Sequence, residues 1–246
     1  MFNYLIKIEY NGSKFVGWQY QKNGISIQEK IEKALKKIFS IKVRINGAGR
    51  TDKGVHAYGQ FANFLINHKI EDKKKFLNSI NFFLGKNLIS ILEVKEKNKE
   101  FHARHYAKER IYEYQIVNRH GSLSLDKLKS WHIKKKIDLN MLKKGAKILV
   151  GTHDFSTFKA SSCSSNSPVK KMNSVKIKKK GDKIYIKFSS RSFLQNQVRS
   201  MVGSLKYLST GKWSIIDFKK ALKSKKRASC APPAPACGLY LSNIKY

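Results

Sequence analysis

Apolar and polar residues alternate over the first ten positions of the chain, in the stretch FNYLIKIEY. A period of two is typical of a β-strand with one buried face, so we expect a strand over Asn3–Tyr10. The next patterned stretch has apolar residues at helical spacing, at Ile27, Ile31, Leu35 and Ile38. Ser26 and Glu29 stand before it with the spacing of a capping box, which predicts that a helix begins there.

The same two periods divide the rest of the chain into short strands and helices. Further strands are expected over 41–46, 58–66, 87–94, 106–117, 174–180, 183–189 and 239–246. Further helices are expected over 72–84, 139–150, 193–208 and 215–222. In the helix over 72–84, the residues expected to face the core are Phe76, Leu77, Ile80, Phe83 and Leu84. Gly181–Asp182 is expected to turn a hairpin between two of the strands.

Strands and helices are mixed in both halves of the sequence, and turn residues join several of the strands. This favours an α+β fold whose sheet is mainly antiparallel. We expect two parts, residues 1–105 and residues 106–246, with the functional site in a cleft between them.

The charge of the chain indicates its partner. The 246 residues include 51 Lys and Arg against 16 Asp and Glu, a net charge of +35. Such a surface attracts polyanions, and the release of counterions makes nucleic acid the natural one, even if part of the excess is a proteome-wide lysine bias. Only eight of the basic residues are Arg. Because lysine serves wherever a point charge is wanted, these arginines are better candidates for sites that need a planar guanidinium, and Arg50 is one of them.

The three cysteines suggest a reducing compartment. Cys163, Cys230 and Cys237 are widely spaced and lack zinc-ligand spacing. With no secretion signal, we expect free thiols and a cytoplasmic location. No apolar run reaches the length of a membrane span, so we expect no membrane segment.

The most informative segment is INGAGRTDKGVHAYGQFANF, in which a lone acid, Asp52, stands between Arg50 and Lys53 in a glycine-rich loop. A tight turn in which Asp52 caps backbone amides is one explanation. A phosphate-binding loop is not, because GAGRTDKG lacks the spacing of the Walker A and dinucleotide fingerprints. A carboxylate flanked by two cations stays ionised at neutral pH, and an ionised carboxylate suits nucleophilic or base work.

A reactive carboxylate on an RNA-attracting surface would act on a nucleotide. A base within an RNA helix must first be extruded, and an aromatic ring can stack on the extruded base. Arg50 could fill the vacated place or hold the neighbouring phosphates. The stretch RIYEYQI, residues 110–116, offers Tyr112 and Tyr114 for the stacking. We expect these two rings to face opposite ways, one toward the core and one toward the cleft, and the residues alone do not choose between them.

The segment GAGRTDKGVHA closely resembles the catalytic motif of the TruA family of tRNA pseudouridine synthases. Other segments resemble the same family in the same order: IKIEYNGSKFVGWQYQ, FHARHYAKERIYEY, GTHDFSTF, FLQNQVRSMVG and APPAPACGLYL. The resemblance covers essentially the whole chain. It implies two similar lobes around a mixed, mainly antiparallel sheet, and a central basic cleft for the anticodon stem-loop. It also implies a homodimer and a reaction without metal or organic cofactor.

The resemblance also implies roles for single residues. Asp52 matches the catalytic aspartate, and Tyr112 matches the tyrosine that stacks on the target base. Arg199 matches the basic residue that holds the aspartate side chain, and Arg50 matches the motif arginine next to the RNA. Arg199 falls at the edge of the apolar stripe of its predicted helix, from which it can reach a cleft. Residues 195–197 (Gln-Asn-Gln) depart from the family, since many relatives have histidines and a methionine there.

The function implied is pseudouridine formation in the anticodon stem-loop of tRNA, at positions 38–40. The alternative is a non-catalytic basic RNA-binding protein. That alternative explains the charge equally well, but not an aspartate where a phosphate binder would want only cations and amides. The remaining candidates are expected to form hydrogen bonds or to contact RNA; they are His56, His102, His105 and His153.

Overall fold

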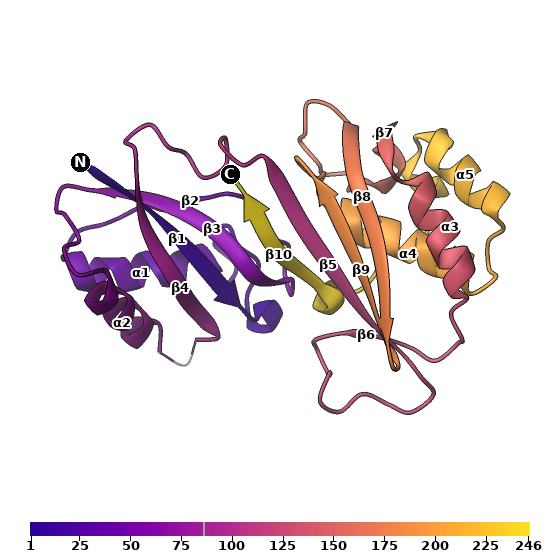
Figure 1. Cartoon of the computed structure of the whole chain (residues 1–246), viewed down its shortest axis with the longest axis horizontal. Helices are drawn as coiled ribbons and strands as arrows, with labels where there is room; N and C mark the ends of the chain where they lie inside the picture. The colour runs from indigo at the N-terminus through magenta and orange to yellow at the C-terminus, as the bar shows by residue number, and fades with distance from the viewer. Residues whose placement is uncertain (86) are drawn as a thin grey trace. The chain divides into compact units, whose positions relative to one another are not determined.

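The computed structural model describes residues 1–85 and 87–246, shown as a ribbon in Figure 1. The chain forms two compact units. Unit 1 comprises Met1–Lys108 and Tyr240–Tyr246, and unit 2 comprises Glu109–Leu239. The end of the chain belongs to unit 1 because its last strand pairs with a strand of that unit. The α+β class expected from the sequence is confirmed.

Unit 1 is a mostly antiparallel sheet with two helices. Its strands are β1 (Phe2–Tyr10), β2 (Asn46–Gly47), β3 (His56–Ile66), β4 (Ile89–Lys97) and β10 (Leu239–Lys245). β1 lies between β3 and β4 and runs antiparallel to both, while β10 pairs with β3 in parallel. The helices are α1 (Ile27–Phe39) and α2 (Lys73–Leu84), and a short 3-10 turn, η1 (Gly12–Lys14), follows β1.

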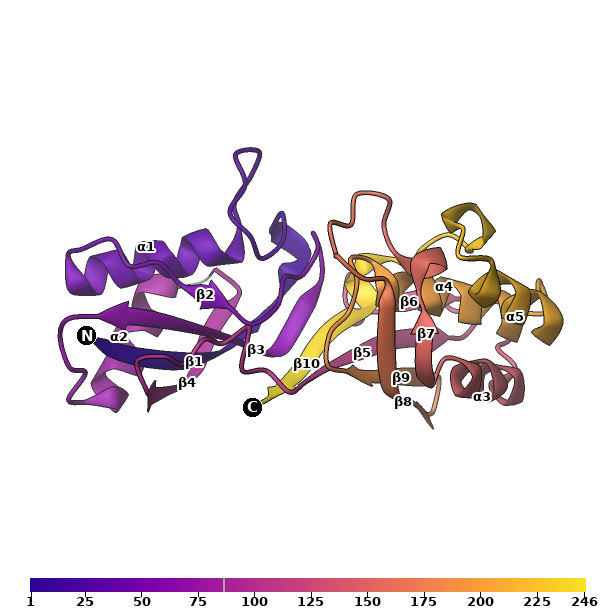
Figure 2. The same ribbon diagram turned by 90° about the horizontal axis from the view of Figure 1, so that it is seen from above.

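The core of unit 1 lies between its strands and its helices. Figure 2 shows α1 along one face of the strands. The buried residues include Tyr4, Ile6, Ile8 and Phe64 from the strands and Ile31, Leu35, Phe76 and Ile80 from the helices. Both helices begin at capping residues, because the Ser26 side chain accepts from the Glu29 amide and the Asp72 side chain from the Lys75 amide. The predicted starts of both helices are therefore confirmed.

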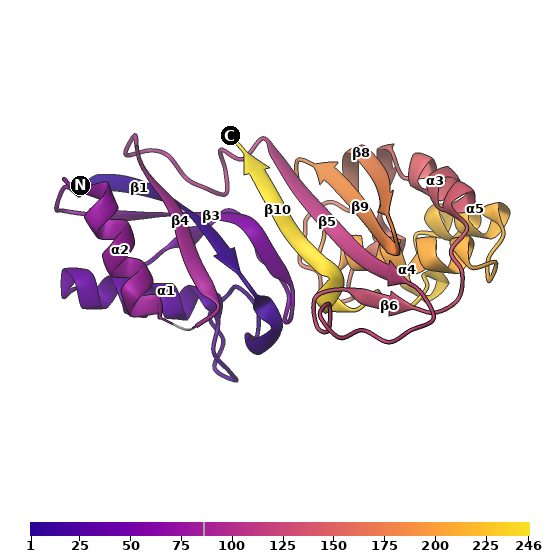
Figure 3. The same cartoon turned by 60° about the horizontal axis from the view of Figure 1, so that its bottom comes forward.

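Unit 2 also combines strands with helices. Its strands are β5 (Glu109–Asn118), β6 (Trp131–Ile133), β7 (Gly151–Asp154), β8 (Val169–Lys180) and β9 (Lys183–Ser190). They pair in the order β5-β9-β8-β7, all antiparallel, and β6 runs parallel to β5 (Figure 3). The helices are α3 (Leu139–Ile148), α4 (Gln197–Ser209) and α5 (Ile215–Ser224). Short 3-10 turns lie at Ser156–Phe158, Arg227–Ser229 and Ala236–Gly238.

α4 is the central helix of unit 2. It is buried along most of its length, and both α3 and α5 pack against it. Its apolar stripe, formed by Val198, Met201, Val202 and Leu205 at helical spacing, is buried. The hairpin of β8 and β9 turns at Gly181 and Asp182, as predicted.

Three local predictions were wrong. The segment 41–46 is mostly not a strand: Val43 and Ile45 are buried, but the Ile45 amide donates to the Glu32 side chain instead of to a neighbouring strand. The helix expected over 193–208 begins only at Gln197, because Asn196 has a left-handed backbone with φ 61°. Phe83 was expected in the core, but it is 36% exposed and lies beneath the ammonium group of Lys37.

Candidate active site

The glycine-rich loop runs from β2 to β3 in unit 1, and no helix follows it. Its backbone is held from several sides. The Ala48 amide donates to the Phe61 carbonyl at 2.8 Å, and the Gln60 side-chain amide donates to the Gly49 carbonyl at 2.6 Å. The Trp18 amide donates to the Thr51 carbonyl at 3.0 Å. These bonds fix the loop against the sheet and against the segment after η1.

Thr51, the residue directly before Asp52, is held in place by burial and by a hydrogen bond. Its side chain is 7% exposed, and its hydroxyl lies 2.8 Å from the Tyr10 hydroxyl at the end of β1. Asp52 itself is half-buried, while Arg50 and Lys53 are exposed. The loop therefore has a buried, hydrogen-bonded foundation beneath one carboxylate and two outward cations.

Two glycines give this loop its shape. Gly54 has φ 80° inside the turn that the Val55 amide closes on the Asp52 carbonyl at 3.1 Å, and L-residues with a side chain rarely adopt that backbone. Gly17 also has positive φ, and a Cβ atom there would lie 2.7 Å from the Thr51 carbonyl oxygen. The close approach of the segment 16–18 to the loop thus requires a glycine.

Tyr112 lies on β5 in unit 2, and its orientation corrects the sequence prediction. Tyr112 and Tyr114 are two residues apart, so they point to the same face of the strand, and both are buried. The expectation that they face opposite ways was wrong. The Tyr112 ring is 8% exposed and packs edge-on against Phe193, with ring centroids 5.1 Å apart and an interplanar angle of 84°. Phe193 therefore fixes the tilt of the Tyr112 ring.

Tyr114 has a structural environment. Its hydroxyl donates to the Pro235 carbonyl at 2.7 Å, and a Cβ atom at Gly238 would lie 2.7 Å from its ring. Burial raises the pKa of Tyr114 well above its ordinary value, so the hydroxyl stays protonated. Tyr114 thus holds the connector 231–238 against β5.

Arg199 lies in the first turn of α4 and is half-buried. Its Nε donates to the Ala234 carbonyl at 2.8 Å, and one terminal nitrogen donates to the Asn196 side chain at 3.1 Å. The Ala234 amide donates back to the Arg199 carbonyl at 2.9 Å. These contacts tie the guanidinium to the connector 231–238 and to the left-handed residue before the helix, so its direction is fixed.

Gly203 explains how the connector comes so close to α4. A Cβ atom at this position would lie 2.0 Å from the Pro232 carbonyl oxygen. Any side chain at this position would push the connector away from the helix and carry with it the Ala234 carbonyl that holds Arg199. The glycine inside the helix is therefore required by packing.

A tight turn joins β9 to the segment before α4. The Ser190 hydroxyl shares its one hydrogen between the Lys171 and Ser192 carbonyls, at 2.8 and 2.9 Å. The Arg110 guanidinium donates to the Arg191 carbonyl at 2.5 Å. Because Phe193 follows this turn directly, these bonds also position the ring that packs on Tyr112.

The four predicted site residues divide between the units. Asp52 and Arg50 belong to unit 1, and Tyr112 and Arg199 belong to unit 2. Sequence reasoning missed the supporting residues Thr51, Phe193 and Asn196. Asn196 carried a usable signal, since it stands among the residues that depart from the family pattern and asparagine tolerates a left-handed backbone.

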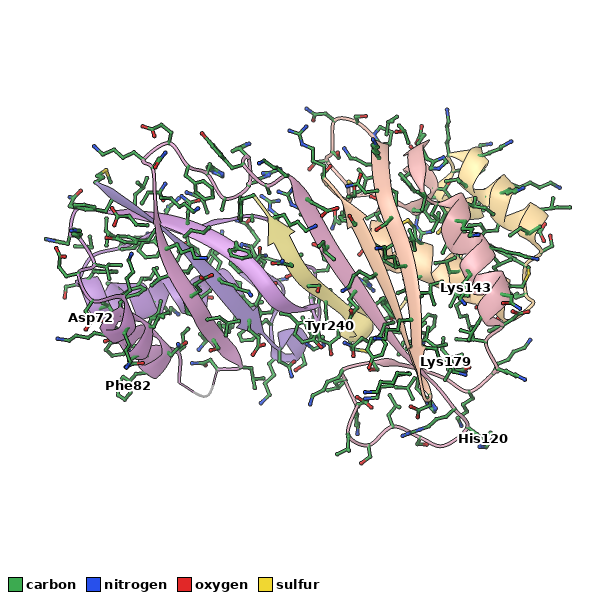
Figure 4. The ribbon with its side chains drawn as sticks, in the orientation of Figure 1. Asp72, Phe82, His120, Lys143, Lys179 and Tyr240 are labelled. Carbon is green, nitrogen blue, oxygen red and sulfur yellow. The ribbon has the colours of Figure 1, made fainter. Side chains whose placement is uncertain are left out.

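Three of the four predicted histidines form hydrogen bonds, as expected. His102 Nδ1 accepts from the Arg104 amide at 3.2 Å. His56 is buried, its Nδ1 accepts from the Gly12 amide at 3.0 Å, and its ring stacks on Tyr240, which Figure 4 labels. His153 Nε2 lies 3.0 Å from the Val150 carbonyl oxygen. The rings of His102 and His105 are 4.4 Å apart, and partial burial, followed by the charges of His105 and Arg104, lowers the pKa of His102.

Within residues 1–85 and 87–246, no group of three or more His, Cys, Asp or Glu side chains could hold a metal ion. In the same residues, no helix is long and apolar enough to cross a membrane. All three cysteines are free thiols.

Comparison with known proteins relates this chain to one family. A family model described as tRNA pseudouridine synthase matches residues 6–105 and 146–246. The chain is 54% identical over 246 residues to tRNA pseudouridine synthase A of Pelagibacter ubique (strain HTCC1062), covering 100% of both chains. It is 41% identical to the enzyme of that name from Maricaulis maris (strain MCS10), covering 99% of this chain and 97% of the relative. The expected resemblance to the TruA family is confirmed, and the chain belongs to the tRNA pseudouridine synthase family.

Proposed function

We propose that this protein is an isomerase that converts uridine to pseudouridine in the anticodon stem-loop of tRNA, at positions 38–40, with Asp52 as its catalytic residue. The family supports the reaction and the tRNA substrate. The observation that carries the role of Asp52 is its setting, a half-buried carboxylate on a loop whose neighbours are pinned by hydrogen bonds. A carboxylate that only capped a turn would need no such rigid support.

The reaction exchanges one bond to the ribose for another. The bond from N1 of uracil to C1′ breaks, and a bond from C5 to C1′ forms. C5 loses its hydrogen to solvent as a proton, and N1 gains a proton. Asp52 starts this exchange by attack at C1′, by addition to C6 or as a base at C2′. Substrate and product contain the same atoms, so the chemistry requires no oxidant, reductant or organic cofactor, and we propose that no metal takes part.

The other three residues bind and orient in this proposal. Tyr112 stacks on the extruded uracil, and its contact with Phe193 supports a ring held at a fixed tilt. Arg199 orients the Asp52 carboxylate in the complex with tRNA, and its bonds to Ala234 and Asn196 support a guanidinium with a fixed direction. Arg50, exposed beside Asp52, occupies the place of the extruded base or holds its flanking phosphates.

The assembly and location follow from the same proposal. We propose a homodimer in the cytoplasm, with residues 1–105 carrying the catalytic loop and residues 106–246 completing a basic cleft. Three free thiols support a reducing compartment. The mass of the protein in solution, measured by light scattering, tests the dimer: twice the 28.3 kDa of the chain is expected.

Tritium release tests the reaction itself. A tRNA transcript labelled with tritium at C5 of uridine is incubated with the protein, because only isomerisation breaks the bond between C5 and its hydrogen. We expect one tritium released for each uridine modified, and chemical mapping of the product to place pseudouridine at positions 38–40. Stable binding of tRNA without tritium release would identify a non-catalytic RNA-binding protein. Release from uridines outside the anticodon stem-loop would contradict the proposed position.

A further inference from the structure

One face of the unit 2 sheet carries lysines that the proposed reaction does not use. Along β9, Ile184, Ile186 and Phe188 are buried, and the residues between them point to the opposite face. α4 lies on the buried side of these strands in Figures 1 and 2. The opposite face of β8 and β9 is therefore solvated.

Four side chains define this surface, which we call the lysine face: Lys176, Lys178, Tyr185 and Lys187. Lys176 of β8 is directly opposite Lys187 of β9, and Lys178 is directly opposite Tyr185. The three lysines are exposed, and Tyr185 is half-exposed. Lys180, at the end of β8, follows Lys176 and Lys178 on this face, whereas Lys179 is paired with Ile184 and belongs to the other face; Figure 4 labels Lys179, together with Lys143 of the neighbouring helix α3.

Two lysines directly opposite each other on adjacent strands destabilise a sheet, because their charges repel at close range. The lysine face has little acid to offset this repulsion. Lys187 lies 3.8 Å from a carboxylate oxygen of Glu113 on β5, a weak pair. Lys176 and Lys178 form no ion pair with an acidic side chain among the residues that the structure describes. An anion placed over Lys176 and Lys187 would turn this repulsion into attraction.

The position of Tyr112 determines which anion fits. Tyr112 is paired with Phe188 across the sheet and shares its buried face, so the lysine face lies on the opposite side of the same sheet. A stem-loop whose base stacks on Tyr112 cannot reach through that sheet to the lysines. Lysines are flexible point charges that suit phosphates of any sequence, and they offer no base-specific fork.

We infer that the lysine face binds backbone phosphates of tRNA outside the anticodon stem-loop. The inference rests on the proposed tRNA substrate and not on the role of Asp52. Charge complementarity supports it: unit 2 has 29 basic residues against 7 acidic ones, a net charge of +22. Phosphate contacts of this kind position a substrate and add affinity without reading its sequence.

The test compares two double variants that remove the same charge. Lys176→Gln with Lys178→Gln alters the lysine face and leaves the pair of Lys187 and Glu113 in place. Lys73→Gln with Lys74→Gln is the matched control, since both lysines are exposed in the first turn of α2 in unit 1. Affinity is measured by filter binding, over a series of salt concentrations, for full-length tRNA and for the isolated anticodon stem-loop. Thermal melting confirms that both variants fold.

For the lysine-face variant we expect affinity for full-length tRNA to fall about tenfold at 100 mM salt, with a salt dependence shallower by about one to two charges. Affinity for the stem-loop should change less than twofold, and so should single-turnover tritium release at saturating tRNA. Unchanged affinity for tRNA would overturn the inference, as would an equal loss in the control or with the stem-loop. Dissociation of a dimer with unchanged tRNA affinity would assign the face to a protein contact and also overturn it. Absence of tritium release from the wild-type protein would contradict the proposed reaction alone.

Discussion

The two units differ in how they use charge and rigidity. Unit 1 has 22 basic and 9 acidic residues, a net charge of +13. Its glycine-rich loop is fixed at the buried Thr51, which is hydrogen-bonded to Tyr10 and to the Trp18 amide. Unit 2 has a net charge of +22. It contains the buried ring of Tyr112, the hydrogen-bonded guanidinium of Arg199 and a long strand, β8, with several exposed lysines. We infer a division of labour, in which unit 1 supplies the reacting group and unit 2 contributes most of the binding affinity for RNA.

The largest expected effect comes from Asp52→Asn. The amide is close in shape to the carboxylate, so the loop keeps its fold, but the charged oxygen needed for nucleophilic or base work is gone. We expect single-turnover tritium release to fall at least about a thousandfold. An Asn variant within tenfold of wild type would remove Asp52 from the chemistry and leave unit 1 without a catalytic group.

Arg199→Lys asks whether unit 2 also serves the chemistry. Only the guanidinium can hold both oxygens of a carboxylate while it donates through Nε to Ala234, and an ammonium group keeps the charge alone. If Arg199 orients Asp52, a misplaced carboxylate lowers the single-turnover rate about a hundredfold. Affinity for tRNA at fixed salt should change less than about threefold. Weaker binding at a normal rate would make Arg199 a phosphate contact.

Substitutions at Tyr112 separate stacking from packing. Tyr112→Phe keeps the ring and its contact with Phe193, while Tyr112→Leu loses the flat face. Stacking of a base on an aromatic ring contributes about 1–3 kcal/mol, so we expect Leu to lower kcat/KM about 5- to 150-fold and Phe to have a much smaller effect. Equal kinetics for both variants and wild type would show that Tyr112 is a core residue only. A lower melting temperature of the Leu variant would then be the only effect of losing the buried ring.

Two tyrosine hydroxyls allow a matched comparison of the units. Tyr10→Phe removes the bond to Thr51 beside Asp52, and Tyr114→Phe removes the bond to Pro235 in the connector. Each change leaves one buried oxygen with a partner lost, which costs about 1–2 kcal/mol in the free energy of unfolding. We expect Tyr10→Phe to slow turnover about tenfold, because it loosens the reactive loop, and Tyr114→Phe to slow it less. The reverse order would place the sensitive element in unit 2.

The smallest expected effect is a change with pH in the stability difference between wild type and Tyr114→Phe. Burial raises the pKa of Tyr114 above that of the unfolded chain, so the hydroxyl contributes its full stability below the ordinary tyrosine pKa of about 10 and loses it as pH rises further. The difference in unfolding free energy between wild type and Tyr114→Phe should therefore be constant from pH 7 to 9 and shrink above pH 10. A difference that grows with pH would contradict the assignment.

Periodicity predicted most of the fold because the apolar faces are regular. The stripe of α4 and the caps Ser26 and Asp72 all stand where the pattern placed them. Failures came where tertiary contacts override the local pattern. Val43 and Ile45 are apolar and buried, yet Glu32 takes the Ile45 amide that a strand would have used. The sequence of the closing strand 239–245 could not show that it pairs with β3, because a strand has the same pattern beside any neighbour.

The candidate site divides in the same way. Asp52 and Arg50 were identifiable because their motif is contiguous, with a glycine where the turn needs positive φ. The residues that position the site were not, since their partners are far away in the sequence. Thr51 is held by Tyr10, Arg199 by Ala234, and Tyr112 by Phe193, which follows β9 in the chain. Tyr112 and Tyr114 show a failure of another kind, because the strand period places them on one face and our expectation did not.

The central claim is that the reacting group, Asp52, can be removed without loss of the affinity for tRNA. The affinity of the inactive Asp52→Asn protein for full-length tRNA, measured by filter binding over a series of salt concentrations, tests it most directly. The division of labour predicts a dissociation constant within about twofold of wild type and the same salt dependence, since no cation is removed. An affinity lower by tenfold or more in the folded variant would show that Asp52 helps to hold the RNA, and the claim would be wrong.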